Sequence, residues 1–124
     1  FSAPLNFYNI HYASTHVVGT SGGNTADMAE ALDMTGRGLL TPSILVTHVG
    51  GLNAVVDTTK NLPNMTGGKK LIYTHIDMPL TAIADFAEKG KSDPMYAKLA
   101  ELVAKTNGLW NAEAEKYLLD TLMK

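Results

Sequence analysis

A glycine-rich turn at residues 19–24, Gly-Thr-Ser-Gly-Gly-Asn, is the first part of this chain whose residue types could do chemistry. It stands between a predicted strand and a predicted helix. There, free backbone N–H groups and the positive helix end can hold an anion or a polar cofactor group. The same glycines could simply satisfy the backbone angles of a tight turn. The turn lacks the lysine of a Walker motif and does not match the GxGxxG dinucleotide fingerprint. The local sequence therefore leaves an anion site and a plain turn both open.

The lysine pair Lys69-Lys70 is a second candidate. Both lysines follow two glycines at the start of a predicted strand. From that position one ammonium group can reach a phosphate, and a solvated lysine at a sheet edge fits the pattern equally well.

Histidines are the remaining candidates. His48 ends a predicted strand just before Gly50-Gly51, and functional groups collect at strand ends. The spacing of the histidines does not match a metal-binding motif, so we expect no metal site within this chain. The four histidines are His11, His16, His48 and His75. No serine stands in a known hydrolase motif.

Composition excludes several classes of function. The chain has no cysteine and a net charge of −2, without long charge runs. Without cysteine the chain cannot form a thiolate metal site or a disulfide. Without an excess of positive charge, its composition does not favour binding to nucleic acid or to an anionic membrane. No apolar run reaches the roughly 18 residues that span a bilayer, and the first residues lack a signal-peptide pattern. We expect a cytoplasmic protein and, because the chain starts with Phe1, a fragment or trimmed piece of a longer one.

The first half of the chain must position these candidates through alternating strands and helices. Residues 5–18 are aromatic and β-branched, which predicts one or two extended segments, the best of them at Thr15–Gly19. Asn24 or Thr25 caps a helix that ends at Gly36-Arg37-Gly38, with an apolar side from Ala26, Met28, Ala29, Leu32 and Met34.

The clearest pattern of the sequence lies in residues 47–74. A buried strand is predicted at residues 44–49, and a helix that places Leu52, Val55, Val56 and Thr59 on one inward face follows it. Asn61-Leu62-Pro63 ends that helix. Gly67-Gly68 then turns the chain into a strand at residues 70–73.

Residues 77–124 are rich in alanine, lysine, glutamate and leucine, which predicts three helices and no further strand. The first starts at Pro79 and ends before Gly90, with Leu80, Ile83 and Ala87 inward. Asp93 caps the second, whose apolar stripe is Met95, Leu99, Leu102 and Val103, and Asn107-Gly108 closes it. Asn111 caps the third, which turns Ala114, Tyr117, Leu118 and Leu122 inward, with Trp110 folded over the joint.

The order of these pieces resembles the C-terminal third of zinc-type medium-chain alcohol and polyol dehydrogenases. The shared pieces are Gly19-Thr20-Ser21, Glu30-Ala31-Leu32, residues 38–42, Val46-Thr47-His48, the helix at residues 52–59 and Gly68-Lys69-Lys70. Four stretches of sequence are similar to those of the L-sorbose-1-phosphate reductase branch of this family: THVVGTSGGN, THVGGLNAVVDTTKNLP, GGKKLIYTHIDMPLTAIADFAEKG and NGLWNAEAEKYLL. The fold class implied is an α/β fragment with the last Rossmann strand, a strand-helix-strand piece and a three-helix tail.

The resemblance implies reversible hydride transfer between NAD(P) and a ketose phosphate, with zinc polarising the carbonyl. It assigns cofactor contacts to Gly19, Thr20, Ser21 and Lys70, and leaves His48 without a role. The family's zinc ligands and cofactor fingerprint are absent from this sequence. The fragment alone should therefore be inactive, with no catalytic residue and no metal ligand of its own.

The same resemblance divides the chain into residues 1–21 of a nucleotide-binding domain, residues 22–76 of a catalytic domain and a helical extension at 77–124. It also allows a homo-oligomer. Two other interpretations stay open: a non-catalytic interaction or oligomerisation module that uses the helical tail, and a stand-alone anion-binding domain that uses residues 19–24.

Overall fold

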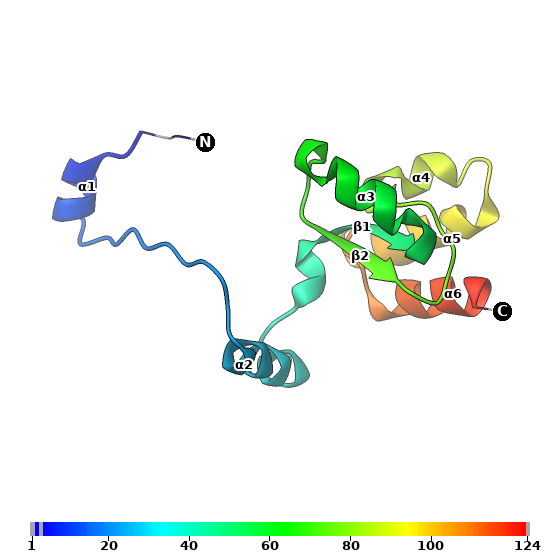
Figure 1. Ribbon diagram of the computed structural model, residues 1–124, viewed down its shortest axis with the longest axis horizontal. Helices are drawn as coiled ribbons and strands as arrows, with labels where there is room; N and C mark the ends of the chain where they lie inside the picture. The colour runs from blue at the N-terminus through cyan, green and yellow to red at the C-terminus, as the bar shows by residue number, and fades with distance from the viewer. Residues whose placement is uncertain (1, 3, 124) are drawn as a thin grey trace.

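The computed structural model describes residues 2 and 4–123 as an N-terminal arm joined to a folded body (Figure 1). The arm carries helices α1 (Phe7–Tyr12) and α2 (Thr25–Gly36), and neither helix has a buried residue. The body begins with the 3₁₀ turn η1 (Pro42–Leu45) and contains every strand assigned among the described residues. The α/β class is therefore confirmed.

The extended segments predicted for residues 5–18 are wrong, and so is the separate strand at Thr15–Gly19. Residues 7–12 form α1 instead, because the side chain of Asn6 accepts a hydrogen bond from the Asn9 N–H (3.1 Å) and caps the first turn. Residues 15–24 belong to no helix or strand. A strand needs a neighbour for its backbone groups, and the described residues place none beside this segment.

Helix α2 begins and ends where the sequence predicts. Asn24 accepts from the N–H groups of Ala26 (2.7 Å) and Asp27 (3.2 Å), and the Asp27 carboxylate accepts from the Asn24 N–H (2.7 Å). This capping box satisfies N–H groups that the first turn leaves free. The expected inward face is wrong, because Met28 and Leu32 are exposed.

The body contains the predicted strand-helix-strand unit. Strand β1 (Val46–Gly51) pairs in parallel with β2 (Lys69–Tyr73), and β1 starts two residues later than expected because Pro42 opens η1. The connection is η2 (Leu52–Ala54), α3 (Val55–Asn61) and η3 (Leu62–Asn64). Helix α3 ends before Pro63, as predicted.

The predicted inward face of α3 is confirmed only at Val55 and is wrong at Leu52, Val56 and Thr59. Leu52 is 53% exposed and Val56 is 61% exposed, whereas Ala54, Val55 and Thr58 are the half-buried side chains. Ala54, Val55 and Thr58 lie one and four residues apart and so share one side of the helix, which leaves Leu52, Val56 and Thr59 turned to solvent. Helix α3 therefore leaves apolar side chains in solvent.

A helix beginning at Pro79 is also wrong. Residues 81–82 form strand β3 (Thr81–Ala82), antiparallel to β1, and only then come η4 (Ile83–Asp85) and α4 (Phe86–Lys89). The backbone just upstream is already bonded to the end of β1. Gly51 N–H donates to the Met78 carbonyl (2.8 Å), and Leu52 N–H donates to the Ile76 carbonyl (3.0 Å). These bonds extend the chain and lead it into the sheet, whose order is β2-β1-β3.

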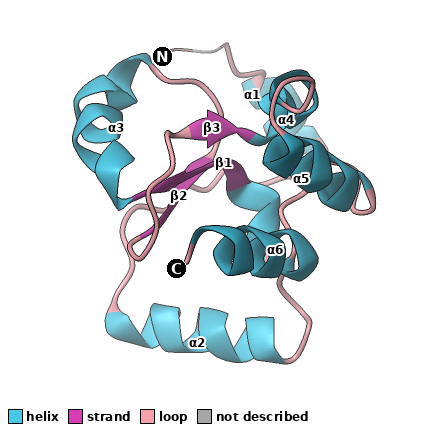
Figure 2. Cartoon of the chain, turned by 90° about the vertical axis from the view of Figure 1, so that its right-hand side faces the viewer, coloured by secondary structure: helices cyan, strands magenta, loops and turns pink. Residues whose placement is uncertain are grey.

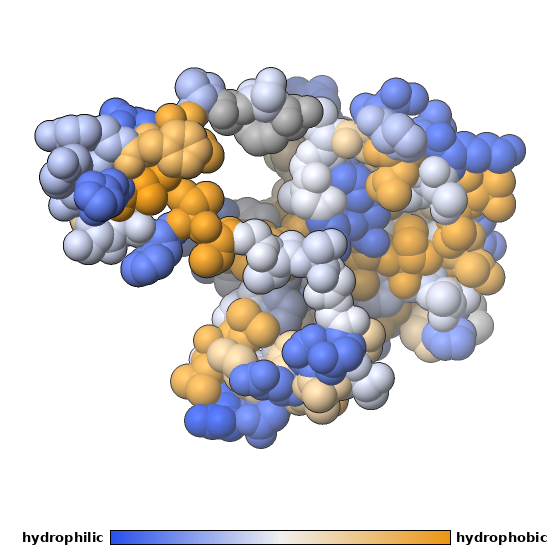
Figure 3. Space-filling view, turned by 60° about the vertical axis from the view of Figure 1, so that its left-hand side comes forward, coloured by the Kyte–Doolittle hydropathy of each residue, from blue (hydrophilic) through white to orange (hydrophobic). Residues whose placement is uncertain are grey.

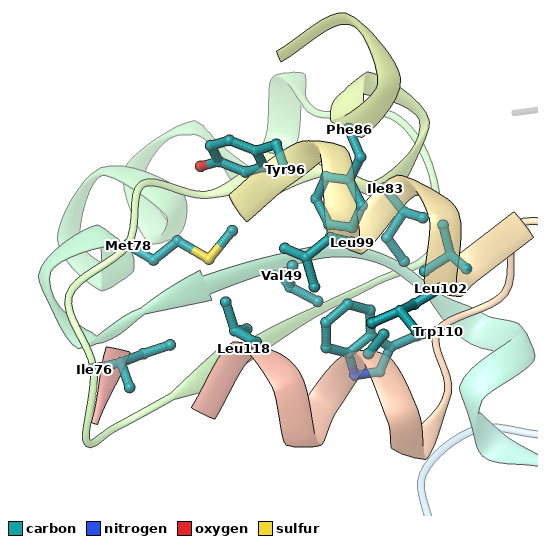
Figure 4. Packing of buried hydrophobic residues seen from close by; sticks show 12 residues of the cluster. Val49, Ile76, Met78, Ile83, Phe86, Tyr96, Leu99, Leu102, Trp110 and Leu118 are labelled. Atoms are coloured by element: carbon teal, nitrogen blue, oxygen red, sulfur yellow. The ribbon is translucent and has the colours of Figure 1, made fainter. Parts of the chain in front are cut away.

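The last two predicted helices are confirmed as α5 (Pro94–Ala104) and α6 (Ala112–Leu122), capped by Asp93 and Asn111. Together with α4 they cover one side of the sheet, and α3 lies on the other side (Figure 2). Buried residues of the sheet, its connections and the three helices form one core (Figure 4): Val49, Ile76, Met78, Ile83, Phe86, Tyr96, Leu99, Leu102, Val103, Trp110, Ala114 and Leu118. The strand unit and the helical tail thus share one interior.

Candidate functional site

His48 and Lys70 are neighbours across the pair of parallel strands, where His48 on β1 is opposite Lys70 on β2. A register irregularity between Val46 and His48 interrupts the pairing just before this point. The Thr47 hydroxyl and His48 Nδ1 are 2.9 Å apart and form a hydrogen bond. The sequence-predicted candidates of the body are therefore brought together, at the start of β2.

The ammonium group of Lys70 is held by backbone oxygens. Lys70 Nζ donates to the carbonyls of Thr66 (2.8 Å), Gly68 (2.8 Å) and Gly67 (3.4 Å). A positive charge that satisfies several carbonyls of one turn stabilises the conformation of that turn. To reach a phosphate, Lys70 would have to exchange these carbonyls for the anion, whereas the neighbouring Lys69 is exposed.

Two glycines let this turn close against β1. Gly67 has φ +85°, and a Cβ there would stand 2.8 Å from the Thr47 hydroxyl. A Cβ at Gly68 would overlap the Leu45 carbonyl oxygen. Larger residues would push the turn away from the strand, so the double glycine brings the turn that holds the Lys70 ammonium against Thr47 and His48.

We predict that Lys70→Met lowers the free energy of unfolding of the chain by about 1 kcal/mol, because the turn carbonyls lose a charged donor. Lys69→Met is the matched control and should change it by less than about 0.5 kcal/mol. Urea unfolding followed by circular dichroism measures both. Equal effects of the two variants would show that the carbonyl contacts of Lys70 add nothing to stability.

The pKa of His48 is lowered from 6.5, first by burial and then by the positive charge of Lys70, while Asp85 acts in the opposite direction. The folded state therefore favours the neutral imidazole. This contribution to stability is complete above the unfolded pKa of 6.5 and is lost as pH falls through the lower folded pKa.

We therefore predict that His48→Gln flattens the loss of stability below pH 6.5. His16→Gln, at an exposed position of the arm, is the control and should leave the slope unchanged. Urea midpoints between pH 4 and 8, a range of about two units around the histidine pKa, give the slope. An unchanged slope in His48→Gln would contradict the assignment.

Two open grooves flank α3. One, of about 400 Å³, lies between α3 and the start of β2 and is lined by Val55, Thr58, Thr59, Leu62, Gly68, Lys69, Lys70 and Ile72. Its lining combines apolar side chains with two lysines, Lys69 and Lys70. Such a lining suits a ligand or a polypeptide surface with both an apolar and an anionic part.

The second groove, of about 410 Å³, runs along the other flank of α3 and contains a polar row that sequence reasoning missed. Asn53, Asp57 and Asn61 recur every four residues, a spacing visible in the sequence and typical of one helix side. Asn53 Oδ1 accepts from the Met78 N–H (3.0 Å), and Asn61 Nδ2 donates to the Asp57 carbonyl (2.9 Å). Two of the three side chains in this row, those of Asn53 and Asn61, therefore stabilise the fold.

Gly19, Thr20 and Ser21 lie in the arm, between α1 and α2 and away from β2 (Figure 1). They are exposed, and none of the grooves described above includes them. This chain does not bring them together with Lys70. Their assignment as cofactor contacts stays a prediction about a larger assembly.

A half-buried polar network that the sequence did not reveal connects β2 to the helical tail. The Tyr73 hydroxyl donates to Glu115 Oε2 (2.7 Å) and accepts from Trp110 Nε1 (2.9 Å). Burial and the bond to Glu115 raise the pKa of Tyr73. This network is part of the scaffold, because it fixes the sheet against α6 and does not line the grooves beside α3.

Within residues 2 and 4–123 there is no group of three His, Cys, Asp or Glu side chains that could hold a metal ion. These residues therefore do not fit a zinc site. In the same part of the chain, every helix is too short or too polar to cross a membrane.

Comparison with known proteins gives three close relatives. The chain is 64% identical over 119 residues to an uncharacterised protein of Escherichia coli, YggP. It is 53% identical over 120 residues to the mannitol-1-phosphate 5-dehydrogenase of Aliivibrio fischeri. It is 50% identical over 119 residues to the L-sorbose 1-phosphate reductase of Klebsiella pneumoniae.

Each match covers 96–97% of this chain but only 27–28% of the relative, so the chain spans just over a quarter of the length of these proteins. No family model and no solved structure matches it. Over nearly all of its length, the chain therefore corresponds to a segment of proteins that include two polyol-phosphate oxidoreductases, which confirms the resemblance to the L-sorbose-1-phosphate reductase branch.

Proposed function

We propose that this chain is one part of a longer NAD(P)-dependent, zinc-type oxidoreductase that reduces a ketose phosphate of the L-sorbose 1-phosphate type to a polyol phosphate. The observation that carries the proposal is the identity of 50–53% to two named polyol-phosphate oxidoreductases over 96–97% of the chain. At such identity, related sequences share a fold. The shared substrate class of both named relatives supports the choice of a sugar phosphate.

In this reaction the nicotinamide delivers a hydride to the ketose carbonyl carbon, and the resulting oxygen takes up a proton. We assign neither the proton transfer nor zinc binding to a residue of this chain, and we expect residues outside it to carry out both tasks. Its own proposed contribution is to hold the cofactor, through Gly19, Thr20 and Ser21 in the arm and Lys70 in the body. Residues 1–21 would belong to the nucleotide-binding domain, 22–76 to the catalytic domain and 77–124 to a helical extension.

The assignment of Lys70 has a direct test in the longer polypeptide. If Lys70 exchanges its turn carbonyls for the cofactor, Lys70→Met raises the KM for the nicotinamide several-fold and Lys69→Met does not. The assay is run well below the melting temperature of both variants. A Lys70 variant with an unchanged KM and a lowered melting temperature would remove Lys70 from the cofactor site and leave its role in the turn.

The test of the function itself is ketose-phosphate-dependent oxidation of NADH or NADPH by the zinc-supplied longer polypeptide. Activity on L-sorbose 1-phosphate or a close ketose phosphate supports the proposal. A folded, zinc-supplied protein that is inactive on sugar phosphates and polyols would favour a non-catalytic interaction module. The burial of Leu99, Leu102 and Leu118 in the core of this chain argues against a module that uses the tail's apolar stripe for assembly.

A further inference from the structure

Exposed apolar residues are concentrated on the arm and α3. Among the described residues, large exposed apolar side chains run from Leu5 to Leu62 and then do not recur until Met123. Figure 3 shows apolar side chains open to solvent over the arm. Where several exposed apolar side chains gather on one element, they indicate a contact surface.

The helical tail has the opposite character. The outer surface of α5 and α6 carries ion pairs between Lys98 and Glu101 (2.8 Å) and between Lys116 and Asp120 (2.7 Å). Its apolar side chains are already packed against the sheet. The tail therefore presents a polar surface suited to solvent.

On the side of the sheet that α3 covers, the folded body has only one layer, and apolar side chains stay exposed there. Leu52, Val56 and Leu62, which we call the α3 patch, are 53%, 61% and 52% exposed. Neither η2, α3 nor η3 has a buried residue, and a groove of about 400 Å³ lies on each flank of α3. A helix packed on one side only, with open flanks, has room for another layer.

We propose that the α3 patch is an internal interface, covered by the remaining part of the longer oxidoreductase, and that the helical tail faces solvent. This inference rests on the proposed function. The length of the relatives indicates what covers the α3 patch. About three quarters of each relative lies outside the matched segment, and that polypeptide needs an apolar surface to pack on. The patch, unlike the tail, offers one.

The test compares Val56→Lys with Ala104→Lys, a lysine at an exposed position of α5. In the 124-residue chain both should shift the melting temperature by less than about 2 °C, since both positions are exposed. In the longer polypeptide Val56→Lys should lower it by roughly 5 °C or more and Ala104→Lys should not, because only the first lysine would be buried without a partner.

A neutral Val56→Lys in the longer polypeptide would overturn the inference. So would a dimer of the 124-residue chain in sedimentation that Val56→Lys dissociates, because the occupant would then be a second copy. Neither result bears on turnover of ketose phosphate, which is measured separately and decides the proposed function.

Discussion

Replacing Phe86 with alanine is expected to lower the free energy of unfolding by about 4 kcal/mol, because the variant leaves a large cavity at the centre of the core. Phe86 is 0% exposed. Its ring lies 5.8 Å from that of Tyr96 on α5 and 6.3 Å from that of Trp110, measured between ring centroids. The Phe86 side chain thus joins α4 to α5 and to the connection between α5 and α6 (Figure 4).

Phe7→Ala is the matched control, since Phe7 on the arm is 74% exposed. It should change stability by less than about 0.5 kcal/mol. Because a domain of this size has only about 5–15 kcal/mol of stability, Phe86→Ala should remove a large fraction of it. Urea unfolding followed by tryptophan fluorescence reports on the core through Trp110. Similar midpoints for the two variants would contradict the shared core of sheet and tail.

Gly51→Ala is expected to destabilise the chain by about 3 kcal/mol through backbone displacement. A methyl group at residue 51 would overlap the Ile76 carbonyl oxygen and stand 2.5 Å from the Met78 nitrogen. Both atoms are backbone, so they cannot move aside by a change of rotamer. The two backbone hydrogen bonds that hold residues 76–78 against the end of β1 would have to lengthen or break.

Gly36→Ala is the control, because a Cβ at Gly36, the last residue of α2, meets no atom within 4 Å. It should be neutral or stabilising by a few tenths of a kcal/mol. Hydrogen exchange of the Gly51 and Leu52 amides locates the effect. If the amides of Gly51→Ala exchange as slowly as those of the parent chain, the close approach of the two backbones has been overestimated.

Local signals predicted much of the fold. Asn24, Asp93 and Asn111 each cap a helix through a side-chain oxygen, and Pro63 stands just past the end of α3. Helix capping and the effect of a proline act within a few residues, so both can be predicted from the local sequence. The parallel pairing of β1 with β2 also follows from a strand-helix-strand pattern.

Long-range contacts explain the failures. Strand β3 has only two residues, and it forms because Ile76 and Met78 are bonded to residues far upstream, which no local pattern reveals. Val17 and Val18 have strand propensity, yet this chain gives them no neighbouring strand. The apolar periodicity of residues 52–59 predicted that Leu52 and Val56 are buried, and both are exposed in this chain. A layer from outside the chain would have to cover α3 to bury them.

The candidate site was also predictable only in part, because local sequence gives the position of a residue along the chain but not its distant contacts. The position of Lys70 after two glycines indicated a basic group at the start of a strand, and the structure places it there. The carbonyls that hold its ammonium depend on how the turn at Gly67 folds back, and sequence could not give them. The four-residue spacing of Asn53, Asp57 and Asn61 is visible in the sequence, but it was not recognised there as the polar side of α3.

The most direct test of the central claim is a steady-state assay of the longer polypeptide with L-sorbose 1-phosphate, followed by the absorbance of NADH or NADPH. We expect consumption of the reduced nicotinamide that depends on both the ketose phosphate and the protein, and production of a polyol phosphate. The 124-residue chain alone should give none. A folded, zinc-supplied polypeptide that oxidises no reduced nicotinamide with any ketose phosphate would contradict the account.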